Sequence, residues 1–142
     1  MYEWLHYVVE IDNLTYFYDS DNKNLLEQVT DQSNHPKGFK DDGDGLRDYY
    51  YDGFGNLIKD TNKQIDSIFY NYLNLPVEIV FVSGDKIKYI YNALGQKVSK
   101  EVNSNSSIIV TDYLNGGFQY VDGNLSFFPS KSVMLSMFFL LN

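Results

Sequence analysis

The sequence contains no cysteine, so neither disulfide bonds nor thiolate metal sites hold the fold together. Histidine is almost as scarce, and His6 and His35 stand far apart, in an expected N-terminal strand and in a loop. The sequence therefore gives little support for a Ser-His-Asp triad or for a metal site built from histidines. We assign no catalytic residue, no metal ligand and no cofactor, and we expect that the protein is not an enzyme.

Basic residues are also few, with 11 Lys and Arg against 19 Asp and Glu, a formal net charge of -8 and a pI near 4.5. Proteins that bind nucleic acids through the phosphate backbone need clustered Lys and Arg to displace counterions. This charge balance makes nucleic acid an unsuitable partner.

Long apolar runs are absent. The most apolar stretch, residues 133–141, is much shorter than the roughly 20 residues that a membrane-spanning helix needs. The first residues, 1–6, show no basic segment followed by an apolar run, so we expect no signal peptide in the chain as given. We therefore predict no membrane span.

Aromatic residues are abundant instead, at 17% of the chain, with thirteen Tyr and ten Phe. Aromatic side chains favour the pleated, half-buried surface of a β-sheet over a helix. With 44% hydrophobic residues, 142 residues suffice for a modest core. The composition thus predicts an all-β domain or a piece of one.

One stretch, residues 49–60, organises the rest of the sequence. It contains an aromatic strand end at Tyr51, a turn in which Gly53, Gly55 and Asn56 tolerate positive φ, and a new apolar strand that begins at Leu57. We interpret it as half of a β-hairpin, with Tyr51 as a rung in a ladder of stacked aromatic residues.

Degraded copies of this stretch recur about every twenty residues, a period that matches two short strands plus two turns. In the first copy, which contains Tyr16, Tyr18 and Asp19, the turn differs in sequence and lacks glycine. From residue 65 to 72 the sequence alternates, which predicts that Ile68, Tyr70 and Tyr72 share one face of a strand. The positions that carry the repeat are Tyr16, Tyr18, Asp19, Tyr51, Asp52, Gly53, Gly55, Asn56, Tyr70, Tyr72, Pro76, Tyr89, Tyr91, Asn92 and Gly95.

A polar insertion, residues 30–48, separates the first two copies, and we expect it to be an exposed excursion between strands. Its segment from Asp41 to Asp48 has the oxygen ligands and glycines that calcium sites use. The spacing does not match an EF-hand, because Leu46 stands where a third ligand is needed and no Glu closes the loop. A solvated turn is therefore favoured over a calcium site.

The sequence divides into three parts. Residues 1–13 are expected to form a lead-in strand, and residues 14–129 form the hairpin repeats. The apolar tail, 130–142, has no strand alternation, and three interpretations stay open: a last core strand, a short helix, or sequence that belongs to another reading of the gene.

Taken together, the motifs at residues 51–57, 70–76 and 89–97 resemble consecutive units of the YD-repeat, or Rhs-repeat, proteins of bacteria. Residues 112–114, 117–120 and 127–129 resemble the segments that come after these units in some members. The resemblance covers residues 14–129. The chain shows no Asp-His-Leu-Gly-Asn-Val-Arg core segment, no self-cleavage segment and no toxin domain, so it resembles a fragment of such a protein.

The resemblance implies an antiparallel meander of β-hairpins that forms a partial curved sheet or a segment of a β-shell. Members are secreted or lie on the cell surface, often as polymorphic toxins whose shell encloses a toxin domain. The implied function is structural, as part of a shell wall for toxin encapsulation or surface display. The implied partners are neighbouring repeats of a larger chain, further copies joined through strand edges, or an enclosed toxin domain.

Exposed Tyr and Phe on one sheet face offer an alternative function, because aromatic faces stack on sugar rings and phenol hydroxyls form hydrogen bonds. In this hypothesis the chain is a carbohydrate- or protein-binding module. Packing between repeats is favoured over glycan binding, since it selects alternating tyrosines by itself.

Overall fold

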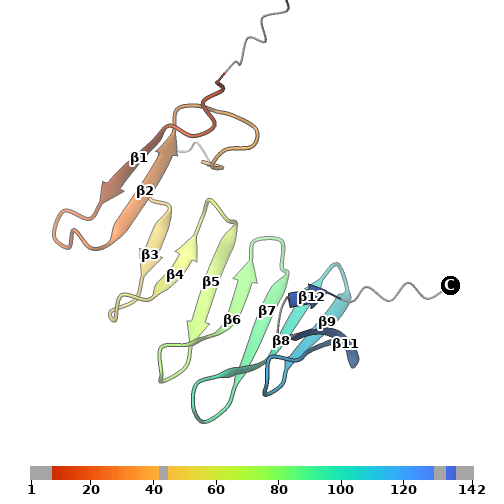
Figure 1. Ribbon diagram of the computed structural model, residues 1–142. Helices are drawn as coiled ribbons and strands as arrows, with labels where there is room; N and C mark the ends of the chain where they lie inside the picture. The colour runs from red at the N-terminus through yellow and green to blue at the C-terminus, as the bar shows by residue number, and fades with distance from the viewer. Residues whose placement is uncertain (1–7, 42–44, 130–133, 137–142) are drawn as a thin grey trace, which may run out of the picture. The chain divides into compact units, whose positions relative to one another are not determined.

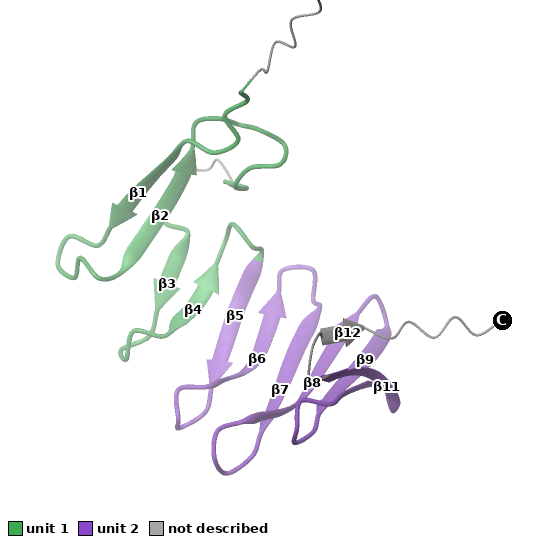
Figure 2. Cartoon of the chain, in the orientation of Figure 1, with its two compact units in different colours: residues 1–64 green, residues 65–142 purple. Residues whose placement is uncertain are grey.

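The computed structural model describes residues 8–41, 45–129 and 134–136, the last of these as backbone only. The described chain is all-β, contains no helix, and pairs its strands antiparallel in the order in which they follow one another (Figure 1). This confirms the predicted fold class of an antiparallel hairpin meander. The chain divides into two compact units, residues 1–64 and 65–142 (Figure 2).

The first unit contains two hairpins. The first hairpin pairs β1 (Leu14–Tyr18) with β2 (Leu26–Asp31), and the second pairs β3 (Tyr49–Tyr51) with β4 (Leu57–Asp60). Residues 8–13 form no strand, so a lead-in strand is absent from that described part of 1–13.

The carboxylate of Asp48 joins the two hairpins of the first unit. Its Oδ2 accepts a hydrogen bond from the backbone N–H of Val29 at 2.8 Å, and its own N–H donates to the carbonyl of Glu27. On the other side, its carbonyl accepts from the N–H of Thr61 at 3.0 Å. Asp48 is fully buried as a result, although the sequence placed it at the end of an exposed loop.

The insertion is also less exposed than its sequence predicted, because it folds back on the residues before β1. Gly38 lies so close to this segment that a Cβ there would collide with the carbonyl oxygen of Ile11. Asp12 accepts a hydrogen bond from the N–H of Phe39 at 2.6 Å, and Asp31 accepts one from the N–H of Asn13. Residues 42–44 lie outside the described part of the chain.

The second unit is a single antiparallel sheet in which each strand pairs with the next along the chain. The short β12 continues the sheet beyond β11, so the predicted tail includes a strand, one of the three interpretations left open. The remaining residues of the tail are outside the described structure. The strands are β5 (Ile65–Tyr70), β6 (Pro76–Phe81), β7 (Lys86–Tyr91), β8 (Lys97–Ser104), β9 (Ser107–Tyr113), β10 (Gln119–Val121), β11 (Asn124–Pro129) and β12 (Met134–Ser136).

The two faces of this sheet differ in chemistry. Directly paired residues of neighbouring strands share a face, so the pairing registers define rows across the sheet. One row, which we call the apolar row, is made only of β-branched residues, and the row one position along each strand centres on two carboxylates and a lysine. The apolar row is Ile68, Ile79, Ile87, Val102 and Ile109, and the adjacent row on the opposite face is Phe69, Glu78, Lys88, Glu101 and Val110.

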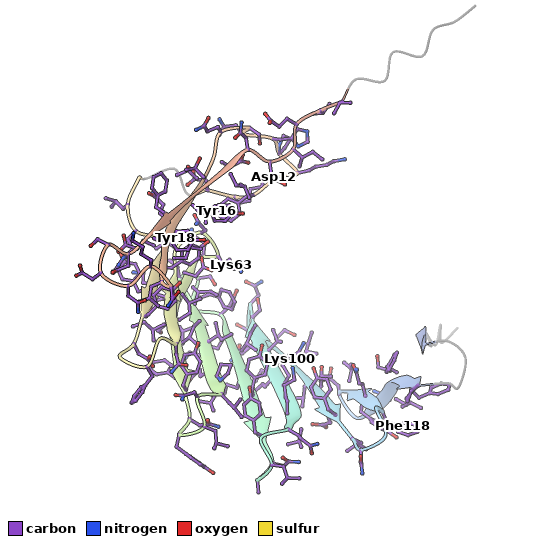
Figure 3. All side chains as sticks on the ribbon, turned by 60° about the vertical axis from the view of Figure 1, so that its left-hand side comes forward. Asp12, Tyr16, Tyr18, Lys63, Lys100 and Phe118 are labelled. Carbon is purple, nitrogen blue, oxygen red and sulfur yellow. The ribbon has the colours of Figure 1, made fainter. Side chains whose placement is uncertain are left out.

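The apolar row is only partly removed from water. Ile68 is buried, Ile79, Ile87 and Val102 are half-buried, and Ile109 is 45% exposed. Within the described residues of this unit, no second layer packs over the row, and side chains project from both faces of the sheet (Figure 3). The apolar row is therefore a partly exposed strip that a covering layer would remove from water.

Candidate functional site

Four turns of the chain close with the same pair of backbone hydrogen bonds, whereas in the first copy of the motif the N–H of Asp19 donates to the carbonyl of Leu25. In the turn between β3 and β4, the N–H of Asp52 donates to the carbonyl of Asn56 at 2.9 Å, and the N–H of Gly55 donates back to the carbonyl of Asp52 at 3.1 Å. The turns that follow β5, β7 and β9 close with the same two bonds, Asn71–Leu75 with Asn74–Asn71, Asn92–Gln96 with Gly95–Asn92, and Leu114–Phe118 with Gly117–Leu114.

The first residue of the turn also closes it through its side chain. The Oδ1 atom of Asp52 accepts hydrogen bonds from the N–H groups of Phe54 and Asn56, both at 2.9 Å. Asn71 and Asn92 accept the equivalent pair of N–H groups in their own turns. Asp and Asn are common in turns because their side-chain oxygen reaches the backbone two residues ahead. Leu114 has no such oxygen.

Turns of this kind need one residue in the left-handed region, and each turn supplies it at the fourth position. Gly55 has φ of 84°, Gly95 has φ of 75°, and Asn74 takes the same place with φ of 55°. Gly53 and Asn56, which tolerate positive φ, do not adopt it in this turn. A Cβ at Gly53 would meet no atom within 4 Å, and glycine is not required there.

Two motif tyrosines act through their hydroxyl groups. Tyr51 donates a hydrogen bond to the carbonyl of Leu26 at 3.0 Å, and Tyr91 donates one to the carbonyl of Pro76 at 2.9 Å. Burial raises the pKa of both phenols, since the charged form loses solvation. Each bond ties a turn to the strand or hairpin before it, a role that the hypothesis of stacked rings did not include.

The ring of Tyr91 also contacts the ring of Tyr89 in a tilted pair, with centroids 6.5 Å apart. The motif tyrosines of β1 and of the turn after β5 are more exposed. Tyr16 and Tyr18 of β1 are about half exposed (Figure 3), with exposed fractions of 51% and 53%. Tyr72 stands in the turn after β5 rather than on the strand, and it is 89% exposed.

A hollow of about 940 Å³ opens in the second unit between the turn after β7 and the turn after β9. One of its lining residues is Gly116, which stands where three other turns of the motif have a larger side chain. The third residue of the turn is Phe54, Leu73 or Leu94 in the turns after β3, β5 and β7, but it is Gly116 in the turn after β9. In the intact pattern, Leu73 and Leu75 fill the space beside Gly95 of the following turn, at 4.0 and 3.4 Å from the position of a Cβ.

The walls of the hollow combine apolar, amide and aromatic groups. Lys97 lies between two aromatic rings, with its Nζ 5.0 Å from the ring centroid of Tyr89 and 4.9 Å from that of Tyr113. Cation–π contacts of this length hold the ammonium group in place. The lining residues include Asn92, Leu94, Gln96, Lys97, Asp112, Tyr113, Leu114, Asn115, Gly116 and Tyr120.

Neither the hollow nor Lys97 was predicted from the sequence. The sequence shows only that Gly116 stands where Phe54, Leu73 and Leu94 stand in other turns, which does not by itself indicate a hollow. The polar groups at this site do not form a reacting constellation, because the acceptors of Asn92 are occupied by its own turn and Asp112 accepts a hydrogen bond from Ser99 at 2.8 Å.

Among the described residues, no group of three or more His, Cys, Asp or Glu side chains is placed to hold a metal ion. The segment proposed as an alternative calcium site falls partly on residues 42–44, which lie outside the described chain. His35 accepts a hydrogen bond from the N–H of Lys37 through Nδ1. In the described part of the chain, no helix has the length and apolarity to cross a membrane.

Comparison with protein-family models, with curated proteins and with solved structures finds no match for this chain. The resemblance to the YD-repeat family consequently depends on the sequence motifs alone.

Proposed function

We propose that the chain is a structural repeat module, a segment of the wall of an Rhs-type β-shell in a secreted or cell-surface bacterial protein, with no catalysis of its own. The observation that carries this proposal is the apolar row of the second unit, which faces no second layer of described residues. A sheet with one apolar face gains stability when another layer or chain covers that face.

The repeated turn supports the same proposal. Repeat proteins stack units that cannot bury their own apolar face alone, so neighbouring units or further copies complete the core. Here the turn recurs with the same backbone bonds and with hydroxyl bonds to the preceding strand. The natural partners in this proposal are neighbouring repeats of a larger chain, and the enclosed content is a toxin domain or another cargo.

Sedimentation velocity across a concentration series tests the proposal. The isolated chain is expected to self-associate, and its thermal unfolding is expected to be broad. Ile109→Lys places a charge on the apolar row and should reduce association, whereas Ile108→Lys changes the neighbouring residue of β9, which lies on the opposite face. A monomer that unfolds in one sharp transition, unchanged by Ile109→Lys, contradicts the proposal.

The hollow favours a second candidate function, the binding of carbohydrate. Tyr113 and Tyr120 supply aromatic surface, and Gln96 and Asn115 supply amide groups that match sugar hydroxyls. Titration calorimetry against the ligands found on a glycan array tests this candidate. Binding should be lost in Tyr113→Ala and retained in Tyr16→Ala, which removes an exposed tyrosine of the other unit. An array without signal eliminates the candidate.

A further inference from the structure

We propose that Asn115 is a site of spontaneous backbone rearrangement, at which the nitrogen of Gly116 attacks the side-chain amide and converts Asn115 into aspartate and isoaspartate. The carboxamide of Asn115 is folded back on the following peptide bond. Its Oδ1 atom lies 3.0 Å from the backbone nitrogen of Gly116 and accepts a hydrogen bond from it. The amide carbon is bonded directly to this oxygen, so the two reacting atoms are close neighbours.

The chemistry needs only water. The nitrogen of Gly116, after losing its proton to solvent, forms a bond to Cγ of Asn115, the bond from Cγ to the amide nitrogen breaks, and ammonia leaves with a proton from solvent. The product is a five-membered succinimide. Water then opens the ring at either carbonyl, which gives aspartate, or isoaspartate with the main chain running through the side-chain carboxyl. The sum is amide plus water to acid plus ammonia, without a change in oxidation state.

The surroundings of Asn115 permit this attack. Gly116 has no Cβ to shield its nitrogen, and with Gly117 it forms a pair of residues with φ of 84° and 85° in an exposed turn. Asn115 is also the single asparagine of the sequence that a glycine follows. Because no Cβ stands beside it, the nitrogen of Gly116 can approach the carbonyl carbon of the Asn115 side chain.

In the described part of the chain, two aspartates precede a glycine, and each has its Oδ1 atom hydrogen-bonded elsewhere. Asp52 precedes Gly53, but its Oδ1 is engaged by the N–H groups of Phe54 and Asn56. Asp122 precedes Gly123, but its Oδ1 accepts a hydrogen bond from the N–H of Val110 at 2.9 Å. The structure therefore separates Asn115 from the two other described positions with a similar sequence.

The asparagines of the other turns are restrained in the same way. Asn71 and Asn92 each use Oδ1 to accept two backbone hydrogen bonds and are followed by residues with side chains. Conversion of Asn115 would add one negative charge at the hollow, and isoaspartate would add a methylene group to the main chain of the turn. This inference is independent of the proposed function.

Peptide mapping of the full-length chain, incubated at mildly alkaline pH and sampled over time, tests the proposal. Asn115 is expected to convert roughly tenfold or more faster than Asn71 and Asn92, because only its amide faces the following nitrogen. Isoaspartate is measured independently by enzymatic methylation of the same samples.

The matched variant is Asn115→Gln, which keeps the amide but requires a larger ring, so the acid product at this position should disappear. Gly116→Ala, which shields the nitrogen, should slow conversion of Asn115, and a circular-dichroism spectrum shows whether that variant keeps its strands. Conversion at Asn71 or Asn92 that equals or exceeds conversion at Asn115 overturns the proposal, as does a wild-type Asn115 that stays intact.

Discussion

The phenol hydroxyl of Tyr91 donates a hydrogen bond at 2.9 Å to the backbone carbonyl of Pro76, 15 residues earlier in the chain. This bond connects the end of β7 to the start of β6, at the edge of the sheet where the turns after β5 and β7 lie. The equivalent bond from Tyr51 to Leu26 connects the two hairpins of the first unit. The tyrosine before each of these two turns thus fastens its turn to the preceding strand or hairpin.

Removal of this hydroxyl should destabilise the second unit. Tyr91→Phe leaves the half-buried carbonyl of Pro76 without its donor, which typically costs about 1 kcal/mol in the free energy of unfolding. Urea denaturation followed by circular dichroism measures the change. Tyr89→Phe is the control, because it keeps the bond to Pro76, and an equal loss in both variants would contradict this role of Tyr91.

The turn after β9 should become more stable when it receives the residue that the other turns have. Leu114→Asn introduces a side-chain oxygen where Asn71 and Asn92 accept two backbone N–H groups, and Leu114 is 55% exposed, so little packing is lost. We expect a gain of about 0.5–1.5 kcal/mol, measured as a higher urea midpoint. Leu114→Ala, which lacks the oxygen, should give no gain.

Two glycines of the motif should respond differently to alanine. Gly95→Ala forces a Cβ onto a residue with φ of 75° and against Leu75 at 3.4 Å, and it should destabilise the protein by about 1–2 kcal/mol. Gly53→Ala meets open space without positive φ, so its effect should be close to zero. Thermal unfolding of both variants provides the measurement, and a similar loss in both would show that φ is not the cause.

Acid should weaken the turns that begin with aspartate. The hydrogen bonds from the Asn56 side chain and from backbone N–H groups hold the pKa of Asp52 below its ordinary value of 3.8, and N–H groups of Asn22 and Asp21 lower the pKa of Asp19. A carboxyl with a lowered folded-state pKa contributes stability above its unfolded pKa, and this contribution is lost as pH falls through the folded value. Stability should therefore decrease below about pH 4.

Asp52→Asn isolates this effect, because asparagine already closes the equivalent turns at Asn71 and Asn92. The variant should keep the fold, and its unfolding free energy should depend less on pH below about pH 4 than that of the wild type. The comparison uses urea denaturation at a series of pH values. Identical pH profiles would show that Asp52 does not contribute to the acid sensitivity.

The sequence was sufficient to predict most strands and the spacing of the turns. The apolar strand that was predicted to begin at Leu57 is β4, which starts at that residue, because the turn residues before it mark the end of the preceding strand. The register shift at the end of β5 was not predicted: Phe69 pairs with Glu78, but Tyr70 pairs with Pro76, so Val77 of β6 is the extra residue. A bulge of this kind adds a residue to one strand and leaves no mark in a pattern of polar and apolar residues.

The environment of Asp48 could not be predicted either. In the sequence it ends a polar stretch, and an acidic residue in such a stretch is usually solvated. Its carboxylate accepts a hydrogen bond from the N–H of Val29, which is 19 residues away in the sequence and belongs to the first hairpin. The hollow beside Gly116 could not be predicted from the sequence either, because it forms only where two turns of different hairpins lie next to each other.

Because strands that follow one another in the chain are also paired in space within each unit, folding needs almost no search for distant partners. Low contact order is associated with fast folding, and an isolated hairpin closes in about 1–10 μs. Each hairpin can therefore form on the previous one while the ribosome is still synthesising the next. For a strip of repeats, the order of translation becomes the order of assembly.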